Sequence, residues 1–388
     1  MGKGEVTLLV LLDLSAAFDT IDHNILLKRL MNRYKVQGQA LEWFKSYLTQ
    51  RSQAVCVNDT VSDKLRLRYG VPQGSKLGPI LFNSYIAPVS EVAQRNQVSD
   101  EKYADDEQLI LSFKPNFLED QTNAVRKMER CISEIRDFLH KNMLCNNGDK
   151  TELLIIGTPQ QLNKLKVSSI MVDNIEIKTA ETVRNLGVVF DKEMTMESHV
   201  RKMCKNAYFN LRNISKIRNS LDKDTVKTAV NALVSPHLDY GNGLLYNISK
   251  KLIDKLQVAQ NSAVRLIEQL NRRDSITCHR KNLHWLPIHA RIQFKILMTT
   301  WKALNNQAPE YINNLIELKQ QPDHNLRSND KLQLVVPCTR NNNKMADRAF
   351  SSAAPELWNS LEYKVKTCNS LDSFKRKLKT HLFQKFYS

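Results

Sequence analysis

Apolar and polar positions in the first part of the chain follow two different periods. The chain opens with VTLLVLLDLSAAF, a continuous β-prone apolar run that predicts a buried strand ending at Asp13. Residues 23–50 have the apolar spacing of an amphipathic helix, with a break near Gly38. Residues 54–68 then alternate around Asn58-Asp59, which predicts a hairpin.

Further along, the same two periods predict more elements. A Gly/Pro-rich loop, GVPQGSKLGP, leads into an apolar helix over residues 77–92, and a strand-like stretch follows. The remaining elements of this mixed region are a helix over residues 117–142, the strand TELLIIG, a hairpin turning at Asp173-Asn174 and the strand VRNLGVVF. After His199 the pattern is helical almost throughout. We therefore predict an α+β region at residues 1–195, a helical region at 196–275 and a second helical region at 276–388.

Charge divides the chain at a similar place. The whole sequence holds 57 basic and 40 acidic residues, a net charge of +17. Residues 1–110 hold 13 of each sign, whereas residues 200–300 hold 18 basic and 6 acidic residues. A neutral first part followed by a basic helical part predicts that chemistry lies in the first and polyanion binding in the second.

Cysteine usage and hydropathy limit the cellular setting. The seven cysteines are scattered without paired spacing, which predicts reduced thiols in a nuclear or cytoplasmic protein. The apolar run at residues 6–12 is too short to span a bilayer, and no signal peptide is evident, so we expect no membrane association.

Three aspartates stand out by position. Asp105 and Asp106 are adjacent in KYADDEQLILSF, a stretch that otherwise reads as a strand, and Asp13 ends the first apolar run. A solvated hairpin turn would explain the adjacent pair, and a helix-capping role would explain Asp13. Alternatively, strand-end carboxylates brought together repel unless Mg²⁺ or Mn²⁺ neutralises them. Two such ions roughly 4 Å apart support in-line phosphoryl transfer.

The order of the motifs decides between these interpretations. In order and spacing, five segments resemble the palm motifs of reverse transcriptases from non-LTR (LINE-type, jockey-like) retrotransposons: LLDLSAAFDTIDH, GVPQGSKLGPILF, YADD, DKTELLIIG and VRNLGVVFD. LHWLPIHARIQFKI and RAFSSAAPELWNSL resemble the C-terminal region of the same elements. The resemblance implies a palm, an antiparallel sheet with packed helices, followed by a basic helical thumb and a helical C-terminal region.

The same resemblance implies roles for individual residues. Asp13 and Asp105 would bind the two catalytic Mg²⁺ or Mn²⁺ ions, with Asp106 in the same cluster. Lys150 matches the lysine that protonates the departing pyrophosphate, although a solvated surface lysine is the alternative. The motif around LGVVF would be the primer grip.

Three further residues match the nucleotide site of the family. Phe18 stands where the family keeps an aromatic ring under the nucleotide sugar, which excludes a 2′-hydroxyl, although an isolated Phe is usually a core residue. Gln73 and Gly74 match the loop that contacts the incoming nucleotide and the template base, although a plain helix-entry turn uses the same residues.

Beyond His199, one predicted helix has two distinct faces. Four basic residues fall within about 60° on a helical wheel: Arg201, Lys205, Arg212 and Lys216. Apolar residues cluster on the other side: Val200, Met203, Ala207, Leu211 and Ile214. A solvated basic face is the usual explanation for one such helix, but the regional charge favours contact with a nucleic-acid backbone.

Two hypotheses for function follow. The first is an RNA-directed DNA polymerase that uses an RNA template, a DNA primer and deoxynucleoside triphosphates. The second is a truncated, inactive retrotransposon remnant that only binds nucleic acid. In the family, fingers and endonuclease regions precede the first palm motif, and we expect both to be absent here, which would weaken activity. We also expect Glu107, where a Thr-like residue is usual, to add a negative charge beside the metals. Oligomeric state is not predicted.

Overall fold

The protein folds into two compact units. The computed structural model describes residues 4–172, 174–319, 332–337 and 346–387. Contacts divide the chain once, between Gly187 and Val188, and each unit has a hydrophobic core of its own. We describe the two units separately.

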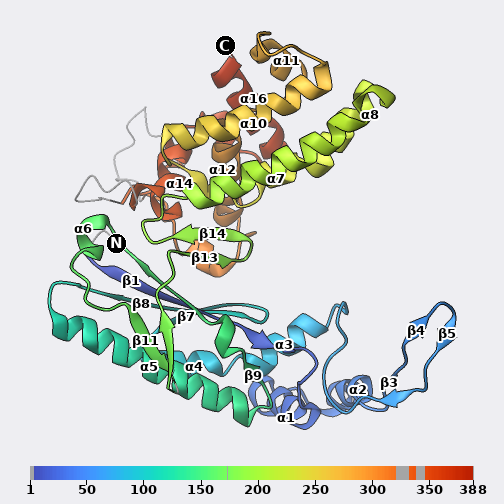
Figure 1. Ribbon diagram of the computed structural model, residues 1–388, viewed down its shortest axis with the longest axis vertical. Helices are drawn as coiled ribbons and strands as arrows, with labels where there is room; N and C mark the ends of the chain where they lie inside the picture. The colour runs from blue at the N-terminus through green and yellow to red at the C-terminus, as the bar shows by residue number, and fades with distance from the viewer. Residues whose placement is uncertain (1–3, 173, 320–331, 338–345, 388) are drawn as a thin grey trace. The chain divides into compact units, whose positions relative to one another are not determined.

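A four-stranded antiparallel sheet forms the centre of the first unit (Figure 1). Its strand order is β10-β1-β8-β7. The strands are β1 (Val6–Leu12), β7 (Ser99–Tyr103), β8 (Asp106–Phe113) and β10 (Glu152–Ile156). The continuous apolar run predicted a central buried strand, and β1 indeed pairs on both sides. The predicted antiparallel sheet with packed helices is confirmed.

Helices complete the core of this unit. They are α1 (His23–Tyr34), α2 (Gly38–Leu48), α3 (Gly78–Ile86), α4 (Val89–Arg95), α5 (Leu118–Lys141) and α6 (Pro159–Leu162). One face of the sheet is packed against α4 and α5, and α1 is packed against α2 and α3. The helix predicted over residues 77–92 is two helices, because Pro88 has no backbone N–H to continue the first and instead precedes α4 as its N-cap.

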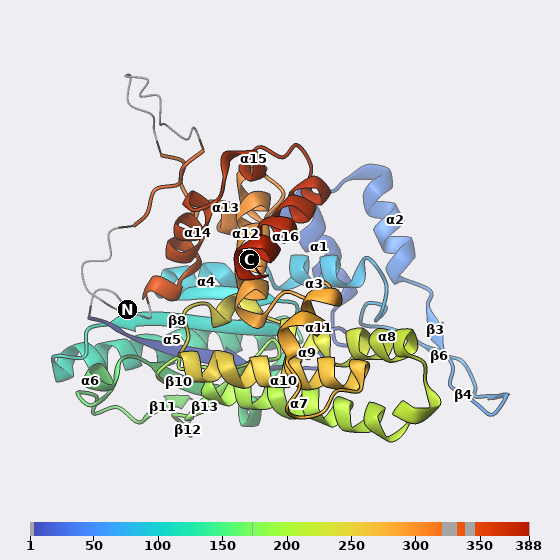
Figure 2. The same ribbon diagram turned by 90° about the horizontal axis from the view of Figure 1, so that it is seen from above.

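Short strands form the edges of the unit. A β3–β6 ladder (Ser52–Gln53, Leu65–Arg66) and a β4–β5 hairpin (Cys56–Val57, Thr60–Val61) confirm the hairpin predicted around Asn58-Asp59. Figures 1 and 2 show it extending away from the sheet. The other short strands are β2 (Leu14–Ser15), β9 (Cys145–Asn146), β11 (Ser169–Val172), β12 (Ile175–Lys178) and β13 (Thr182–Asn185). Of the predicted turn between β11 and β12, Asp173 lies outside the described residues.

The second unit begins with β14 (Val188–Asp191) and is otherwise helical. Its longer helices are α7 (Glu197–Lys216), α8 (Lys223–Leu233), α10 (Lys250–Glu268), α12 (Ile288–Leu304), α14 (Phe350–Asn359) and α16 (Leu371–Tyr387). The shorter ones are α9 (Ser235–Asp239), α11 (Ile276–Asn282), α13 (Glu310–Asn313) and α15 (Tyr363–Lys366). The helical pattern predicted after His199 is confirmed.

The predicted boundary at 275/276 does not coincide with a break between compact units. Helices on both sides of it share one core, which includes Leu256 and Ala263 of α10 together with Trp301 of α12. Across the same boundary, the Gln260 side chain donates to the Leu286 carbonyl over 2.9 Å, and the Ile288 amide donates to Gln257. A composition shift cannot reveal such packing, because it depends on contacts between segments far apart in sequence.

Two further findings concern the whole described chain. Each of the six cysteines within the described ranges is a free thiol. No helix in the described part of the chain is long and apolar enough to cross a membrane.

Candidate active site at the ends of β1 and β8

Two predicted carboxylates meet where β1 ends and β8 begins. Asp13 follows the last residue of β1, and Asp106 is the first residue of β8. The strands pair antiparallel with Leu12 opposite Glu107, so the end of one lies beside the start of the other. Both aspartates line a pocket of about 410 Å³. The sheet register therefore brings together two residues that are far apart in sequence.

A tight hairpin fixes the position of the second carboxylate. Tyr103 pairs with Asp106, which leaves Ala104 and Asp105 as a two-residue loop between β7 and β8. Ala104 has a φ of 55°, in the left-handed region that two-residue hairpins require but that a non-glycine residue rarely adopts. The local structure is thus the hairpin turn considered in the sequence. Asp105, predicted as a metal ligand, lies in this loop and does not line the pocket, although its charge acts on Asp106.

Like charges dominate the electrostatics of this site. Partial burial raises the pKa of Asp106 above its ordinary value, and the carboxylates of Asp105 and Asp13 raise it further. Asp13 is partly relieved of this repulsion, because the Lys150 ammonium lies 3.3 Å from its carboxylate. The backbone supports that approach, since the Asn147 amide donates to the Asp13 carbonyl over 2.9 Å. The site therefore concentrates negative charge and holds the Lys150 ammonium against Asp13.

The donor set suits a divalent cation. Among the described residues, no group of three or more His, Cys, Asp or Glu side chains is already close enough to hold a metal ion. Asp13 and Asp106 nevertheless supply carboxylate oxygens to one pocket, which are the ligands that Mg²⁺ and Mn²⁺ prefer. The repulsion between the carboxylates of Asp13 and Asp106 contributes to the raised pKa of Asp106, and a cation bound between them would neutralise it. This repulsion is the observation that supports a cation site.

Glu107 differs from the prediction. Its side chain is 2 % exposed and lies on the opposite face of β8 from Asp106, as neighbouring strand residues must. The charges that act on it are those of Lys102 and Asp100 on β7, and burial raises its pKa to about 7. Glu107 borders the pocket, but both of its carboxyl oxygens are buried, so the negative charge that we expected beside the metals is directed into the core.

The residues matched to the nucleotide site lie on two interlocked loops. The Val71 amide donates to the Phe18 carbonyl, and the Gly70 amide donates to the Ile21 carbonyl, each over 2.8 Å. A Cβ on Gly70 would lie 2.9 Å from the Asp19 carbonyl oxygen, so only glycine permits this approach. The two loops are held together by their backbones.

These loops give each predicted residue a defined environment. The Phe18 ring is partly buried, 4.8 Å from the Phe82 ring. The Gln73 amide donates to both carboxylate oxygens of Asp19 at 3.1 Å, at the edge of a second pocket of about 660 Å³. Gly74 has a φ of 77°, which a tight turn at this position requires.

Sequence reasoning missed four residues that line the carboxylate pocket. They are Gln108, Glu152, Arg184 and Asn185. Gln108 donates to Asn185 over 3.2 Å, and Glu152 lies opposite Leu11 in the sheet. Arg184 falls within a predicted motif, but only the sheet shows that it reaches this pocket.

In the second unit, α7 has the two faces that the sequence predicts. The five predicted apolar residues are buried, and Arg201, Lys205, Arg212 and Lys216 are exposed. Arg201 lies 3.5 Å from Glu197, one turn earlier on the same helix.

Comparison with known proteins agrees with this geometry. Residues 2–190 match the family model of reverse transcriptase (RNA-dependent DNA polymerase). The probable RNA-directed DNA polymerase from transposon BS of Drosophila melanogaster is 25% identical over 266 residues, covering 66% of this chain and 28% of that protein. The RNA-directed DNA polymerase from mobile element jockey of Drosophila funebris is 22% identical over 271 residues, with the same coverage.

Among solved structures, a telomerase from Candida tropicalis in complex with a telomeric RNA fragment aligns with 71% of this chain and 46% of its own, at 11% identity and a TM-score of 0.37. The chain spans 28% of the length of the curated relatives named above. The family match and these relatives confirm the resemblance seen in the motifs. Residues 2–190 of this chain are a reverse transcriptase domain of the kind found in non-LTR retrotransposons.

Proposed function

We propose that this chain is the polymerising part of an RNA-directed DNA polymerase, which adds deoxynucleotides to the 3′-hydroxyl of a DNA primer on an RNA template. The observation that carries the proposal is the meeting of Asp13 and Asp106 at one pocket, with Lys150 3.3 Å from Asp13. Two carboxylates and a lysine at adjoining strand ends are the groups that metal-assisted phosphoryl transfer requires.

Asp13 and Asp106 would hold divalent cations, and Asp105 would contribute from the hairpin loop. Bound Mg²⁺ or Mn²⁺ would supply activation of the primer hydroxyl and stabilisation of the charge that develops on the phosphate. Lys150 would hold a proton beside the leaving pyrophosphate. Its ammonium already lies at the pocket, where the negative charge of Asp13 keeps it.

The interlocked loops would select the nucleotide. Phe18 packs against Phe82, so its ring has little room to move, and a ring held under the sugar would exclude a 2′-hydroxyl. Gln73 and Gly74 form a turn that leaves the backbone open, because nothing lies within 4 Å of the position of a Gly74 Cβ. This supports a close approach of nucleotide and template base to the turn.

Nucleic-acid binding would extend to the second unit, in the thumb role that the sequence predicts. The exposed basic face of α7 would follow the phosphate backbone of the primer–template duplex.

Primer extension tests the proposal. A DNA primer annealed to an RNA template should be extended with deoxynucleotides in Mg²⁺, and Asp106→Asn should reduce the rate by about 100-fold or more, since it removes a metal ligand. Asp63→Asn is the matched control, because Asp63 is exposed in the β5–β6 connection and should be neutral. Equal rates for wild type and Asp106→Asn would contradict the assignment of the site.

A further inference from the structure

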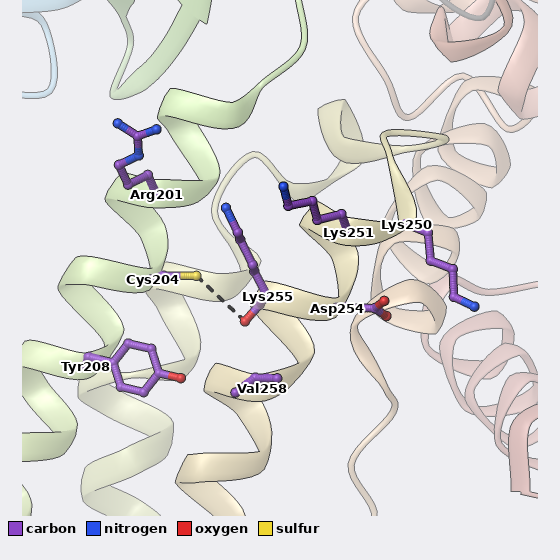
Figure 3. Close-up of a pocket in the computed structure, with 8 residues that line it drawn as sticks. All are labelled: Arg201, Cys204, Tyr208, Lys250, Lys251, Asp254, Lys255 and Val258. Carbon is purple, nitrogen blue, oxygen red and sulfur yellow. Dashed lines mark hydrogen bonds between the residues drawn. The ribbon is translucent and has the colours of Figure 1, made fainter.

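A basic groove runs between two helices of the second unit. It lies between α7 and α10 and has a volume of about 860 Å³ (Figure 3). Three residues line it from α7 and five from α10: Arg201, Cys204 and Tyr208, and Lys250, Lys251, Asp254, Lys255 and Val258. Arg201, one residue of the predicted basic face of α7, is therefore part of a larger feature to which α10 adds cations of its own.

The positive charge of the groove is only partly neutralised. Glu197 is 3.5 Å from Arg201 and 3.8 Å from Lys255, so one carboxylate is shared between two cations at long range. Asp254 is the one acidic residue in the lining, against four basic residues. Figure 3 shows the charged ends of Arg201, Lys251 and Lys255 gathered at one end of the groove. Such an arrangement attracts phosphate groups.

The position of the lysines on α10 does not serve the stability of that helix. Lys250 and Lys251 occupy its first turn, which has no acidic residue. Cations there are opposed by the helix dipole, which favours negative charge at the N-terminus. Their presence is explained if they bind an anion.

The rest of the groove is apolar. Tyr208 is 38% exposed and Val258 is 53% exposed, and they face each other from the two helices (Figure 3). The Cys204 thiol of α7 donates to the Lys255 carbonyl of α10. An exposed aromatic ring beside clustered cations is the combination that binds single-stranded nucleic acid, because bases stack on the ring while cations contact the adjoining phosphates.

We propose that the α7–α10 groove binds a single-stranded nucleic-acid segment, with a base stacked on Tyr208 and neighbouring phosphates on Arg201, Lys251 and Lys255. A duplex would leave the apolar part unused, since its bases are already stacked on one another. The inference rests on the proposed nucleic-acid substrate but needs no polymerase activity. It assigns Arg201 to a single-strand site in the groove and leaves Lys205, Arg212 and Lys216, which do not line the groove, for the proposed duplex contacts.

Fluorescence anisotropy with the full chain tests this. The probes are labelled 12-nucleotide oligo(U), labelled oligo(dT) of the same length and a labelled 12-base-pair duplex. Tyr208→Ala should weaken binding of the single strands about tenfold and change duplex binding less than twofold. Tyr208→Phe should keep wild-type affinity, because the ring remains. Phe209→Ala is the matched control, since Phe209 is 61% exposed on the same helix but does not line the groove.

Charge is tested by the salt dependence of the same binding. The double variant Lys251→Gln, Lys255→Gln should make the negative slope of log K against log salt shallower by about two for the single strands. Tighter binding of oligo(U) than of oligo(dT) would show that the groove selects RNA. Equal affinity would show that it accepts single-stranded RNA and single-stranded DNA alike.

The inference is overturned if Tyr208→Ala and Phe209→Ala have equal effects, or if single strands and duplex are weakened equally. Its failure is distinguishable from failure of the proposed function. Loss of primer extension in Asp106→Asn tests the carboxylate pocket, whereas binding by Tyr208 variants is measured without nucleotides or metal. Thermal unfolding of each variant verifies that the fold is intact.

Discussion

Glu107 has a buried carboxyl group for which neither oxygen has a hydrogen-bond partner among the described residues. Its pKa of about 7, against an ordinary value of 4.5, arises mainly from burial, with Lys102 opposing and Asp100 adding to the rise. The Cys131 thiol on α5 also lies within its field. The folded state thus binds a proton more tightly than the unfolded state does.

This proton should make stability depend on pH. Because the folded-state pKa of Glu107 is raised, the contribution of Glu107 to stability is fully present below about pH 4.5 and is lost as pH rises through about 7. Glu107→Gln should remove that fall and raise the free energy of unfolding at pH 8 by about 3 kcal/mol, with little change at pH 4. Urea unfolding at both pH values measures it. An identical pH dependence in variant and wild type would show that Glu107 does not titrate in this range.

The interlocked loops allow a test of one glycine against another. Gly70→Ala should lower the free energy of unfolding by about 3 kcal/mol, because the new Cβ would meet the Asp19 backbone at 2.9 Å and φ is 86°. Gly74→Ala should cost only about 1 kcal/mol, since its φ is also positive but nothing lies within 4 Å. Urea unfolding of both variants measures the difference, and equal costs would mean that the loops are not locked at Gly70.

At the scale of elements, α7 should contribute measurably to duplex binding. The double variant Arg212→Gln, Lys216→Gln should make the negative slope of log K against log salt shallower by about two. Each exposed cation that meets a phosphate releases about one counterion, and the variant removes two such cations. Lys127→Gln with Lys141→Gln on α5 removes the same charge and should leave the slope unchanged. Anisotropy titrations over a range of salt provide the slopes, and a flatter slope only in the α5 variant would move the duplex surface to the first unit.

Elements were predictable where local pattern decides them. The buried run before Asp13, the break near Gly38 and the two faces of α7 follow from side-chain periodicity, and the structure has all three. The single strand predicted over VRNLGVVF is two strands, because Leu186 and Gly187 both have positive φ. Nothing in the local pattern required that break.

The site was predictable only in part, for a related reason. The family motifs named Asp13, Asp105 and Asp106, but the register of β1 against β8 decides that Asp13 and Asp106 share a pocket. The pairing of Lys150 with Asp13 and the approach of Arg184 depend on which strands are neighbours. Such contacts join distant parts of the sequence, so periodicity and spacing cannot specify them.

At the scale of the whole molecule, separate cores predict separate folding. The core residues of the first unit all lie before residue 173, and those of the second all lie after residue 187. A chain of residues 188–388 should therefore fold alone and unfold cooperatively, with the helical content of its part of the full chain. Circular dichroism during thermal unfolding measures this. A broad, non-cooperative transition would show that the second core depends on the first unit.

The central claim is that antiparallel pairing of β1 and β8 builds one divalent-cation site from Asp13 and Asp106. Thermal unfolding of the full chain during Mn²⁺ titration tests it most directly, because an ion that binds only the folded state stabilises it by mass action. Mn²⁺ should raise the unfolding temperature of the wild type and of Asp63→Asn by several degrees. It should have no effect on Asp13→Asn with Asp106→Asn. An equal rise in all three proteins would contradict the claim.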